Sequence, residues 1–160
     1  MSLPEELAQQ AGELGHPALA LTDHNSVSGS MELAQTAAEH GVRAIHGAEI
    51  DLEVDPQATG QGVRDSALAG ARRTDNPHIT LLVEDEGGWR NLCRILTDVH
   101  AGTRPEGREH REPLPARTTL DVLERHAGGL VCLSGCARHG LAVVDPNAAA
   151  RLARAFPGAF

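Results

Sequence analysis

Apolar residues recur along this chain with two different spacings, one typical of helices and one typical of strands. Apolar residues that return every three or four positions predict helices with one buried face, and short continuous apolar runs predict buried strands. The helical segments are Pro4–Leu14, Ser30–His40, Asp85–His100, a segment from Thr118 or Thr119 to His126, and Ala148–Phe156. The strand segments are Ala18–Thr22, Val42–Leu52, His78–Val83 and Leu130–Ser134. Because helices and strands alternate, the pattern predicts the α/β class, with a mainly parallel sheet covered by helices.

Two segments interrupt this alternation. Residues 53–77 are rich in Asp, Gln, Gly, Arg and Pro and show no clear periodicity. Such a segment offers little apolar surface against the entropy of ordering, so we expect a mobile insertion or a protruding hairpin there. Gly102 to Pro115 is a charged loop that contains Pro and Gly. We therefore predict one domain over residues 1–160, interrupted by an insertion.

Charge and composition limit the kinds of partner. The chain has 160 residues, with 14 basic residues, all of them arginine, against 22 acidic residues, and its net charge is −8. This balance argues against a basic DNA-binding module, although local arginine clusters or a bound cation can still hold a phosphate. Aromatic residues make up only 2% of the chain, which argues against a stacking platform for single-stranded nucleic acid.

The cysteines and the apolar runs bear on the compartment. Cys93, Cys132 and Cys136 are an odd number without the spacing of a zinc finger, which fits a reducing environment. No stretch approaches the ~20 consecutive apolar residues of a membrane span, and the first residues lack the pattern of a signal peptide. These features predict a cytoplasmic protein without a membrane partner.

Candidate chemistry lies where strands end, because functional groups of parallel α/β folds gather at the carboxyl ends of strands. The first strand runs into Asp23 and His24, the second carries Glu49 near its end, and Cys136 follows the last strand. Imidazole, carboxylate and thiolate groups from different strands can together bind zinc, or manganese or iron if water and further carboxylates complete the site.

Each of these residues also has a purely structural explanation. Asp23 and Asn25 can shape a turn with His24 as a solvated neighbour, and Glu49 can be a solvated strand position. His78 can be an ordinary residue at the start of a strand, bonded to a loop. Cys136, like the other two cysteines, can be a reduced core thiol. Spacing alone leaves both explanations open.

Four motifs carry a family resemblance that covers residues 4 to 140. They are ALALTDH at 18–24, GAE at 47–49, HITLLV at 78–83 followed by WRNLC at 89–93, and GLVCLSGC at 129–136. The motifs and their order resemble the polymerase and histidinol phosphatase (PHP) domain. More narrowly, they are similar to the PHP domain of bacterial C-family DNA polymerases, the DNA polymerase III alpha subunit and its error-prone type. Ala48 before Glu49 and the segment from Ser134 to Gly140 favour the error-prone branch.

The resemblance implies a fold and a set of roles. PHP domains are distorted barrels of strands and helices that hold metal ions at the carboxyl ends of the strands. By motif match, His24, Glu49, His78 and Cys136 correspond to metal ligands, with zinc or manganese as the metal. Asp23 would orient the His24 ring, as carboxylates beside metal ligands commonly do. In active members, two or more metals activate water for phosphoester hydrolysis.

The sequence also departs from the family pattern. The opening His-x-His motif belongs just upstream of Pro4, and no closing Asp-x-His follows Cys136, since Asp145 is followed by Pro146. The resemblance therefore implies a partial PHP domain, an incomplete barrel without its first and last strands. An open sheet edge and an uncovered apolar face invite pairing with another chain, so we expect self-association.

These observations lead to one principal hypothesis and two alternatives. The principal hypothesis is a PHP-domain fragment of an error-prone DNA polymerase, inactive by itself, whose parent acts on DNA through a palm domain outside this sequence. The first alternative is a free-standing, metal-dependent PHP phosphoesterase. The second is a non-catalytic structural module with a vestigial metal site.

Overall fold

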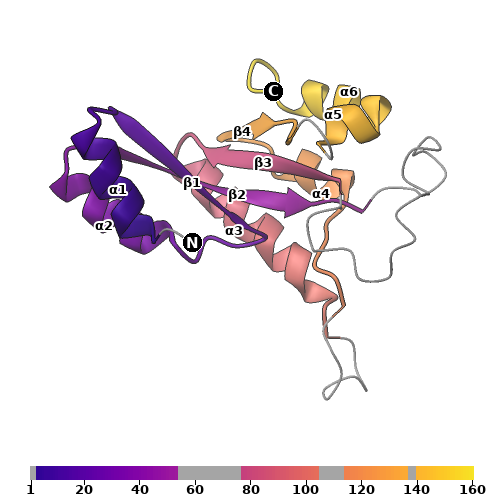
Figure 1. Ribbon diagram of the computed structural model, residues 1–160. Coiled ribbons are helices and arrows are strands. Elements are labelled where there is room, and N and C mark those ends of the chain that lie inside the picture. Colours follow the sequence, from indigo (N-terminus) through magenta and orange to yellow (C-terminus); the bar gives the residue numbers. More distant parts are fainter. Residues whose placement is uncertain (1–2, 54–76, 105–113, 137–139) are drawn as a thin grey trace.

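Four strands and six helices alternate in the computed structural model, which describes residues 3–53, 77–104, 114–136 and 140–160 (Figure 1). The strands are β1 (Ala18–His24), β2 (Arg43–Asp51), β3 (His78–Val83) and β4 (Leu130–Leu133). The helices are α1 (Pro4–Glu13), α2 (Ser30–Glu39), α3 (Glu86–Ala101), α4 (Leu120–Arg125), α5 (Leu141–Val144) and α6 (Pro146–Ala155). Every predicted helix and strand is present with small shifts at its ends, and within these residues only the short α5 was not expected. The insertion predicted at residues 53–77 lies almost wholly outside the described residues.

The strands form one sheet in the order β1-β2-β3-β4. The pair β1–β2 is parallel, whereas β2–β3 and β3–β4 are antiparallel. Three strands therefore run in one direction and β3 runs against them. The predicted α/β class is confirmed, and the expectation of a mostly parallel sheet needs one correction, at β3.

The reversal of β3 has a physical reason in the connections between strands. Parallel neighbours need a crossover, and α2 supplies it between β1 and β2. The sequence between β2 and β3 has no helical periodicity, and antiparallel neighbours can be joined without a helix. The missing helical pattern at residues 53–77 was thus a signal for the direction of β3.

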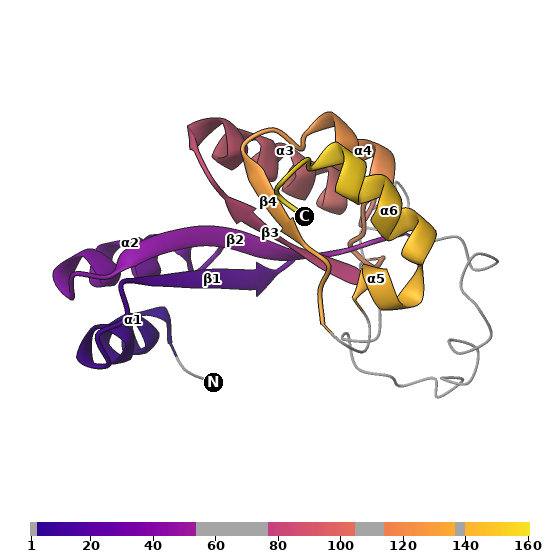
Figure 2. The ribbon, with the colours of Figure 1, turned by 90° about the horizontal axis from the view of Figure 1, so that it is seen from above.

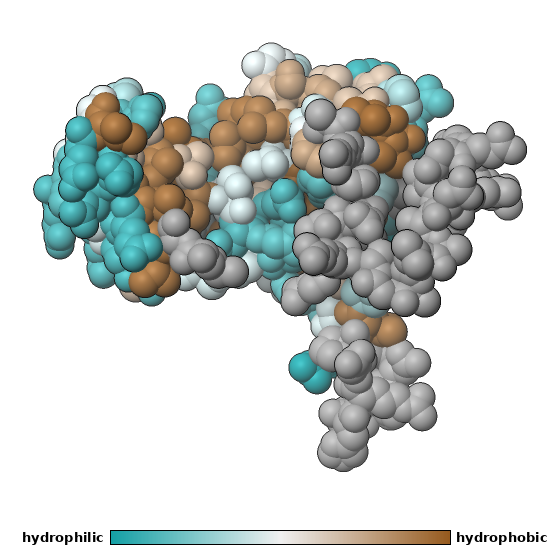
Figure 3. Space-filling model, in the orientation of Figure 1, coloured by the Kyte–Doolittle hydropathy of each residue, from teal (hydrophilic) through white to brown (hydrophobic). Residues whose placement is uncertain are grey.

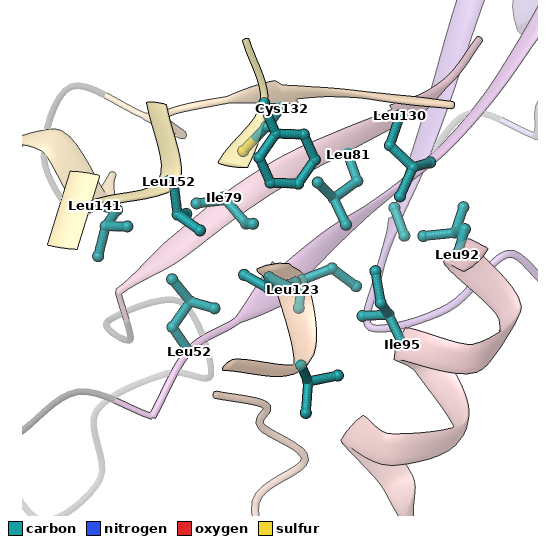
Figure 4. Close-up of a cluster of buried hydrophobic side chains, with 14 of the residues drawn as sticks. Leu52, Ile79, Leu81, Leu92, Ile95, Leu123, Leu130, Cys132, Leu141 and Leu152 are labelled. Carbon is teal, nitrogen blue, oxygen red and sulfur yellow. The ribbon is translucent and has the colours of Figure 1, made fainter. Parts of the chain in front are cut away.

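Most of the core lies between one face of the sheet and the helices α3, α4 and α6 (Figure 4). Side chains alternate along a strand, so Ala48 and Ile50 of β2 and Ile79 and Leu81 of β3 point to this face and are fully buried. The helices contribute Leu92, Ile95, Leu123, Leu141 and Leu152, and Phe156 follows α6 directly; all of these side chains are buried. Burial of aliphatic side chains stabilises the domain by about 1.5 to 3 kcal/mol each.

A second, smaller cluster lies at the other end of the sheet, where α1 and α2 cover β1 and the start of β2 (Figure 1). Its buried members are alanine, leucine and valine: Ala8, Ala11, Leu33, Ala37 and Val42. Small residues at these positions let the two helices approach each other and the sheet closely. None of the helices in the described ranges is long and apolar enough to cross a membrane.

Two helices, α3 and α6, begin where an aspartate side chain accepts hydrogen bonds from their first N–H groups. Asp85 precedes α3 and its Oδ1 accepts a hydrogen bond from the Gly88 N–H at 2.8 Å. Asp145 precedes α6 in the same way and accepts from the N–H groups of Asn147 and Ala148, both at 3.0 Å. Such caps typically stabilise a helix by about 1 kcal/mol, and here they fix where α3 and α6 begin.

Candidate functional site

Polar side chains gather at one end of the sheet, on the face that α3, α4 and α6 leave uncovered. His24 is the last residue of β1, and His78 is the first residue of β3. Glu49 and Asp51 lie at the carboxyl end of β2, where Asp51 is the last residue. In the strand ladder, His24 is opposite Glu49 and Asp51 is opposite His78. Since β3 is reversed, its first residue lies at the end where β1 and β2 finish (Figure 2).

The imidazole of His24 lies between two carboxylates. Its Nδ1 is 2.8 Å from Oε1 of Glu49, and its Nε2 is 3.2 Å from Oδ2 of Asp51. The exposed fraction of the side chain is 29% for His24 and 35% for Glu49, but only 6% for Asp51. A ring with a carboxylate at each nitrogen is held in orientation on both sides, and Asp51 forms the buried side of this arrangement.

His78 extends the group across the sheet. Its Nε2 is 3.9 Å from Oε2 of Glu49 and accepts a hydrogen bond from the backbone N–H of Cys136 at 3.4 Å. Because Nε2 accepts here, the proton of a neutral His78 ring is assigned to Nδ1. The structure thus brings His24, Glu49 and His78 together and places the backbone of Cys136 beside His78.

The turn that carries Cys136 depends on glycine. Gly135 has φ +85°, and a Cβ at this position would lie 2.4 Å from the backbone oxygen of His78. Only glycine combines this left-handed conformation with such a close approach. The sequence Ser134-Gly135-Cys136 is therefore what lets the chain after β4 return to the start of β3.

Asp23 takes a different position from the one that the resemblance implied. Strand alternation puts it on the opposite face of β1 from His24. Its Oδ2 accepts hydrogen bonds from the Gly29 N–H at 2.7 Å and from the Ser28 hydroxyl at 3.4 Å. The described bonds of Asp23 thus fix the loop that leads into α2, and the carboxylates in contact with the His24 ring are Glu49 and Asp51.

Asp51 is the site residue that the sequence reasoning missed. It is two residues after Glu49 in the same strand, so period-two alternation places both carboxylates on one face. That spacing was the available signal. The predicted strand extended to Leu52 and already contained both residues, but only Glu49 belonged to a quoted motif.

The three cysteines are separate and none is in a disulfide. Cys132 is on the core face of β4, and burial raises the pKa of its thiol to about 12. This thiol is therefore protonated at neutral pH, and it lies in the core, on the opposite face of the sheet from the candidate site. Cys93 is partly buried. Cys136 is exposed, so the structural explanation of this residue as a reduced core thiol does not hold.

The arrangement does not fit a metal ion as it stands. Zinc and manganese need donors that converge on one point at about 2.0 to 2.3 Å, whereas both ring nitrogens of His24 face carboxylates directly. Across the described ranges, no group of three or more His, Cys, Asp and Glu side chains could hold a metal ion. A metal ion would bind at His24 only if the ring released one of these carboxylates.

A cavity of about 570 Å³ lies at the opposite end of the sheet. It is lined by the start of β2, the end of β3 and the first turn of α3, including Arg43, Leu82 and Glu84. Trp89 also lines it and makes an edge-on contact with His46, with ring centroids 5.5 Å apart. None of the predicted site residues borders this cavity, so the candidate chemistry is at the other end of the sheet.

Comparisons with known proteins identify one family and relatives that are much longer than this chain. The model of the PHP domain family matches residues 1–151. An error-prone DNA polymerase from Symbiobacterium thermophilum is 33% identical over an alignment that covers 98% of this chain and 14% of the relative. A DNA polymerase III subunit alpha from Chlamydia trachomatis is 32% identical, covering 82% of this chain and 10% of the relative. The chain thus spans only about a tenth to a seventh of the length of these two proteins.

Similar solved structures include one from Bifidobacterium adolescentis, which is described as a candidate metal-dependent phosphoesterase. It is 21% identical, with a TM-score of 0.42, and the match covers 64% of this chain and 29% of that one.

Proposed function

The chain belongs to the PHP domain family, and from that premise we propose that it is the PHP portion of a bacterial C-family DNA polymerase of the error-prone type. The observation that carries this proposal is the distribution of the sequence similarity. Relatives named as error-prone DNA polymerase and as DNA polymerase III subunit alpha match 98% and 82% of this chain with only 14% and 10% of their own length. Such coverage is what a domain within a much larger polymerase gives.

The partners of the domain follow from this context. The parent protein would act on DNA, and a palm domain outside this sequence would carry out two-metal nucleotidyl transfer. The acidic PHP portion, with a net charge of −8, would contribute little broad attraction for DNA. We therefore assign it a role beside the palm, in a cytoplasmic protein of DNA replication or lesion bypass.

The described site offers no preformed metal centre, so we expect the chain to bind metal weakly or not at all. By the family resemblance, His24, Glu49, His78 and Cys136 are the residues that would hold one zinc or manganese ion, and His24 would first have to release one of its carboxylates. The residues of the site orient one another. Glu49 and Asp51 fix the orientation of the His24 ring, and the backbone N–H of Cys136 donates a hydrogen bond to the His78 ring. Asp23 would act on His24 through the loop before α2 and not by contact.

A direct assay tests this proposal. Purified chain is mixed with an aryl phosphate or a labelled DNA 3′ end, with manganese or zinc supplied, and its bound metal is counted by elemental analysis. We expect no turnover and zero or one metal per chain, because two-metal hydrolysis needs bridging ligands that hold ions ~3.5 to 4 Å apart. His24→Ala is the matched variant. Hydrolysis that disappears in this variant would contradict the proposed inactivity of the domain, and the interpretation of its site as incomplete would be wrong.

The flanking reading frame provides an independent check. A palm domain encoded in the same frame is the expected result and excludes a free-standing enzyme. A stop codon on both sides, without a polymerase domain, would overturn the assignment. If the full-length polymerase contains the palm but no metal on its PHP portion, the domain is a structural module within the same parent.

A further inference from the structure

Asn25 follows His24 directly and has an unusual backbone conformation. Its φ is +50°, and within the described part of the chain no other residue besides glycine has a positive φ. Asparagine tolerates this left-handed region better than most residues, because its short side chain can bond locally. The side chain is nonetheless buried, with 7% of the residue exposed. The chain therefore turns sharply at the edge of the site, on a residue that is held inside the protein.

All four polar groups of Asn25 make hydrogen bonds. Its N–H donates to the backbone oxygen of Glu49 at 2.7 Å, and its Oδ1 accepts from the N–H of Asp51 at 3.0 Å. Its Nδ2 donates to the backbone oxygen of Ala116 at 3.2 Å, and its own carbonyl oxygen lies 2.8 Å from Nε2 of His100. Since a carbonyl can only accept, His100 donates through Nε2. One residue thus joins the end of β1 to β2, to α3 and to the segment before α4.

We propose that Asn25 is the positioning residue of this site. It is covalently next to His24 and bonds the backbone of the two residues whose carboxylates face the His24 ring. These bonds set how far the end of β1 extends along β2, and hence where the ring meets Oε1 of Glu49 and Oδ2 of Asp51. This inference rests on the proposed function only because it takes His24, Glu49 and Asp51 as part of the site.

The alternative is that Asn25 only shapes a turn. A turn residue would contribute to stability, but its loss would leave the His24 ring between the same two carboxylates. The two explanations therefore differ in whether loss of the Asn25 side chain changes the surroundings of the His24 ring, and not in whether it lowers the stability of the protein. Activity is not needed to separate them, so a failure of the polymerase assignment leaves this test intact.

The test compares Asn25→Gly and Asn25→Ala with Asn91→Ala. Glycine keeps the positive φ and removes only the side-chain bonds, whereas alanine also introduces backbone strain. Asn91 is the matched control, because its Nδ2 likewise donates to a backbone oxygen, that of Gly128 at 2.8 Å, at the other end of the sheet. The readouts are the thermal midpoint, the hydrogen exchange rate of the Asp51 amide, and the ¹⁵N chemical shifts of the His24 ring at fixed pH.

We expect Asn25→Gly to raise the exchange rate of the Asp51 amide about tenfold, the effect of losing one hydrogen bond, and to shift both His24 ring signals. Asn25→Ala should show the same site signals with a lower thermal midpoint. Asn91→Ala should lower the midpoint without changing either site signal. If Asn25→Gly raises the exchange rate of the Asp51 amide or lowers the midpoint but leaves the His24 signals as in the wild type, Asn25 is a turn residue and the inference is wrong.

Discussion

At the scale of single residues, the tightest requirement is the contact between Gly88 of α3 and Gly129 before β4. A Cβ on Gly88 would lie 1.7 Å from the backbone oxygen of Gly129. That oxygen also accepts a hydrogen bond from the Glu84 N–H at 2.9 Å, so it is fixed in place. The first turn of α3 and the turn into β4 are thus in direct backbone contact, and neither can move without losing this bond.

We predict that Gly88→Ala lowers the free energy of unfolding by about 3 kcal/mol, because α3 must move away from the sheet to admit the methyl group. Gly102→Ala is the control: this glycine at the end of α3 has an ordinary helical conformation and no atom within 4 Å of an added Cβ. Its effect should stay within about 0.5 kcal/mol. Urea unfolding measures both, and equal stabilities of the two variants would show that the close contact is absent in solution.

At the scale of elements, a cluster of charges joins α6 to α4. Arg151 of α6 bonds Glu124 through Nε at 2.5 Å and through Nη2 at 2.7 Å, and its Nη2 also bonds Asp121. The Arg151 guanidinium holds the pKa of both carboxyl groups below their usual values, chiefly by hydrogen bonding. All three side chains are on the surface, so the effect on stability is modest and sensitive to salt.

The sign of the pH dependence follows from those lowered pKa values. A carboxyl group with a lower pKa in the folded state stabilises the fold above its unfolded pKa of about 4, and this contribution is lost as pH falls through the folded pKa. Arg151→Met should therefore have a lower thermal midpoint than the wild type at pH 7, and the difference should vanish by about pH 2. An equal difference at both pH values would mean that Arg151 acts through packing and not through charge.

The order of elements also explains why His78 belongs to the site. In a fully parallel sheet, the first residue of a strand lies at the opposite end from the carboxyl ends of its neighbours. His78 begins β3 and meets Glu49 because β3 is antiparallel to β2. The motif thus identified His78 by resemblance, while the direction of one strand explains how it reaches the site.

At the scale of the whole molecule, β1 is an edge of the described sheet, and apolar surface lies over the strands next to the α1–α2 pair (Figure 3). The strand ALALTDH carries no lysine or proline, the residues that commonly protect an edge from pairing with another chain. On the same face of the sheet as the candidate site, Leu133 of β4 is 46% exposed. An open edge next to apolar surface favours association with a second copy.

We therefore expect the isolated chain to form dimers or larger species at high concentration, measured by sedimentation equilibrium. Ala20→Lys places a charge on the exposed part of β1 and should shift the equilibrium toward monomer by at least about tenfold in the dissociation constant. Gln35→Lys adds the same charge on exposed α2 and should leave it unchanged. A clean monomer of the wild type at high concentration would contradict the open-edge explanation.

The sequence by itself determined the helices and strands and located part of the candidate site. Periodicity located every main helix and strand, because burial of one face repeats locally at 3.6 or 2 residues regardless of the partner. It also put His24 and Glu49 at the ends of neighbouring parallel strands, where they meet at 2.8 Å. Cys136 was likewise a candidate from its place after the last strand, resemblance to the PHP domain added His78, and the family itself is shown by the match over residues 1–151.

Only the tertiary structure decided what depends on contacts between distant segments. The direction of β3, the two carboxylates on the His24 ring and the four bonds of Asn25 each join residues far apart in the sequence. Asp23 and Asp51 show most clearly what the sequence alone could not decide. Both are aspartates, and the residue type does not tell which of the two carboxylates contacts the His24 ring. The pleat points Asp23 away from His24, and the strand pairing brings Asp51 to it, because side-chain direction follows strand register and not distance along the chain.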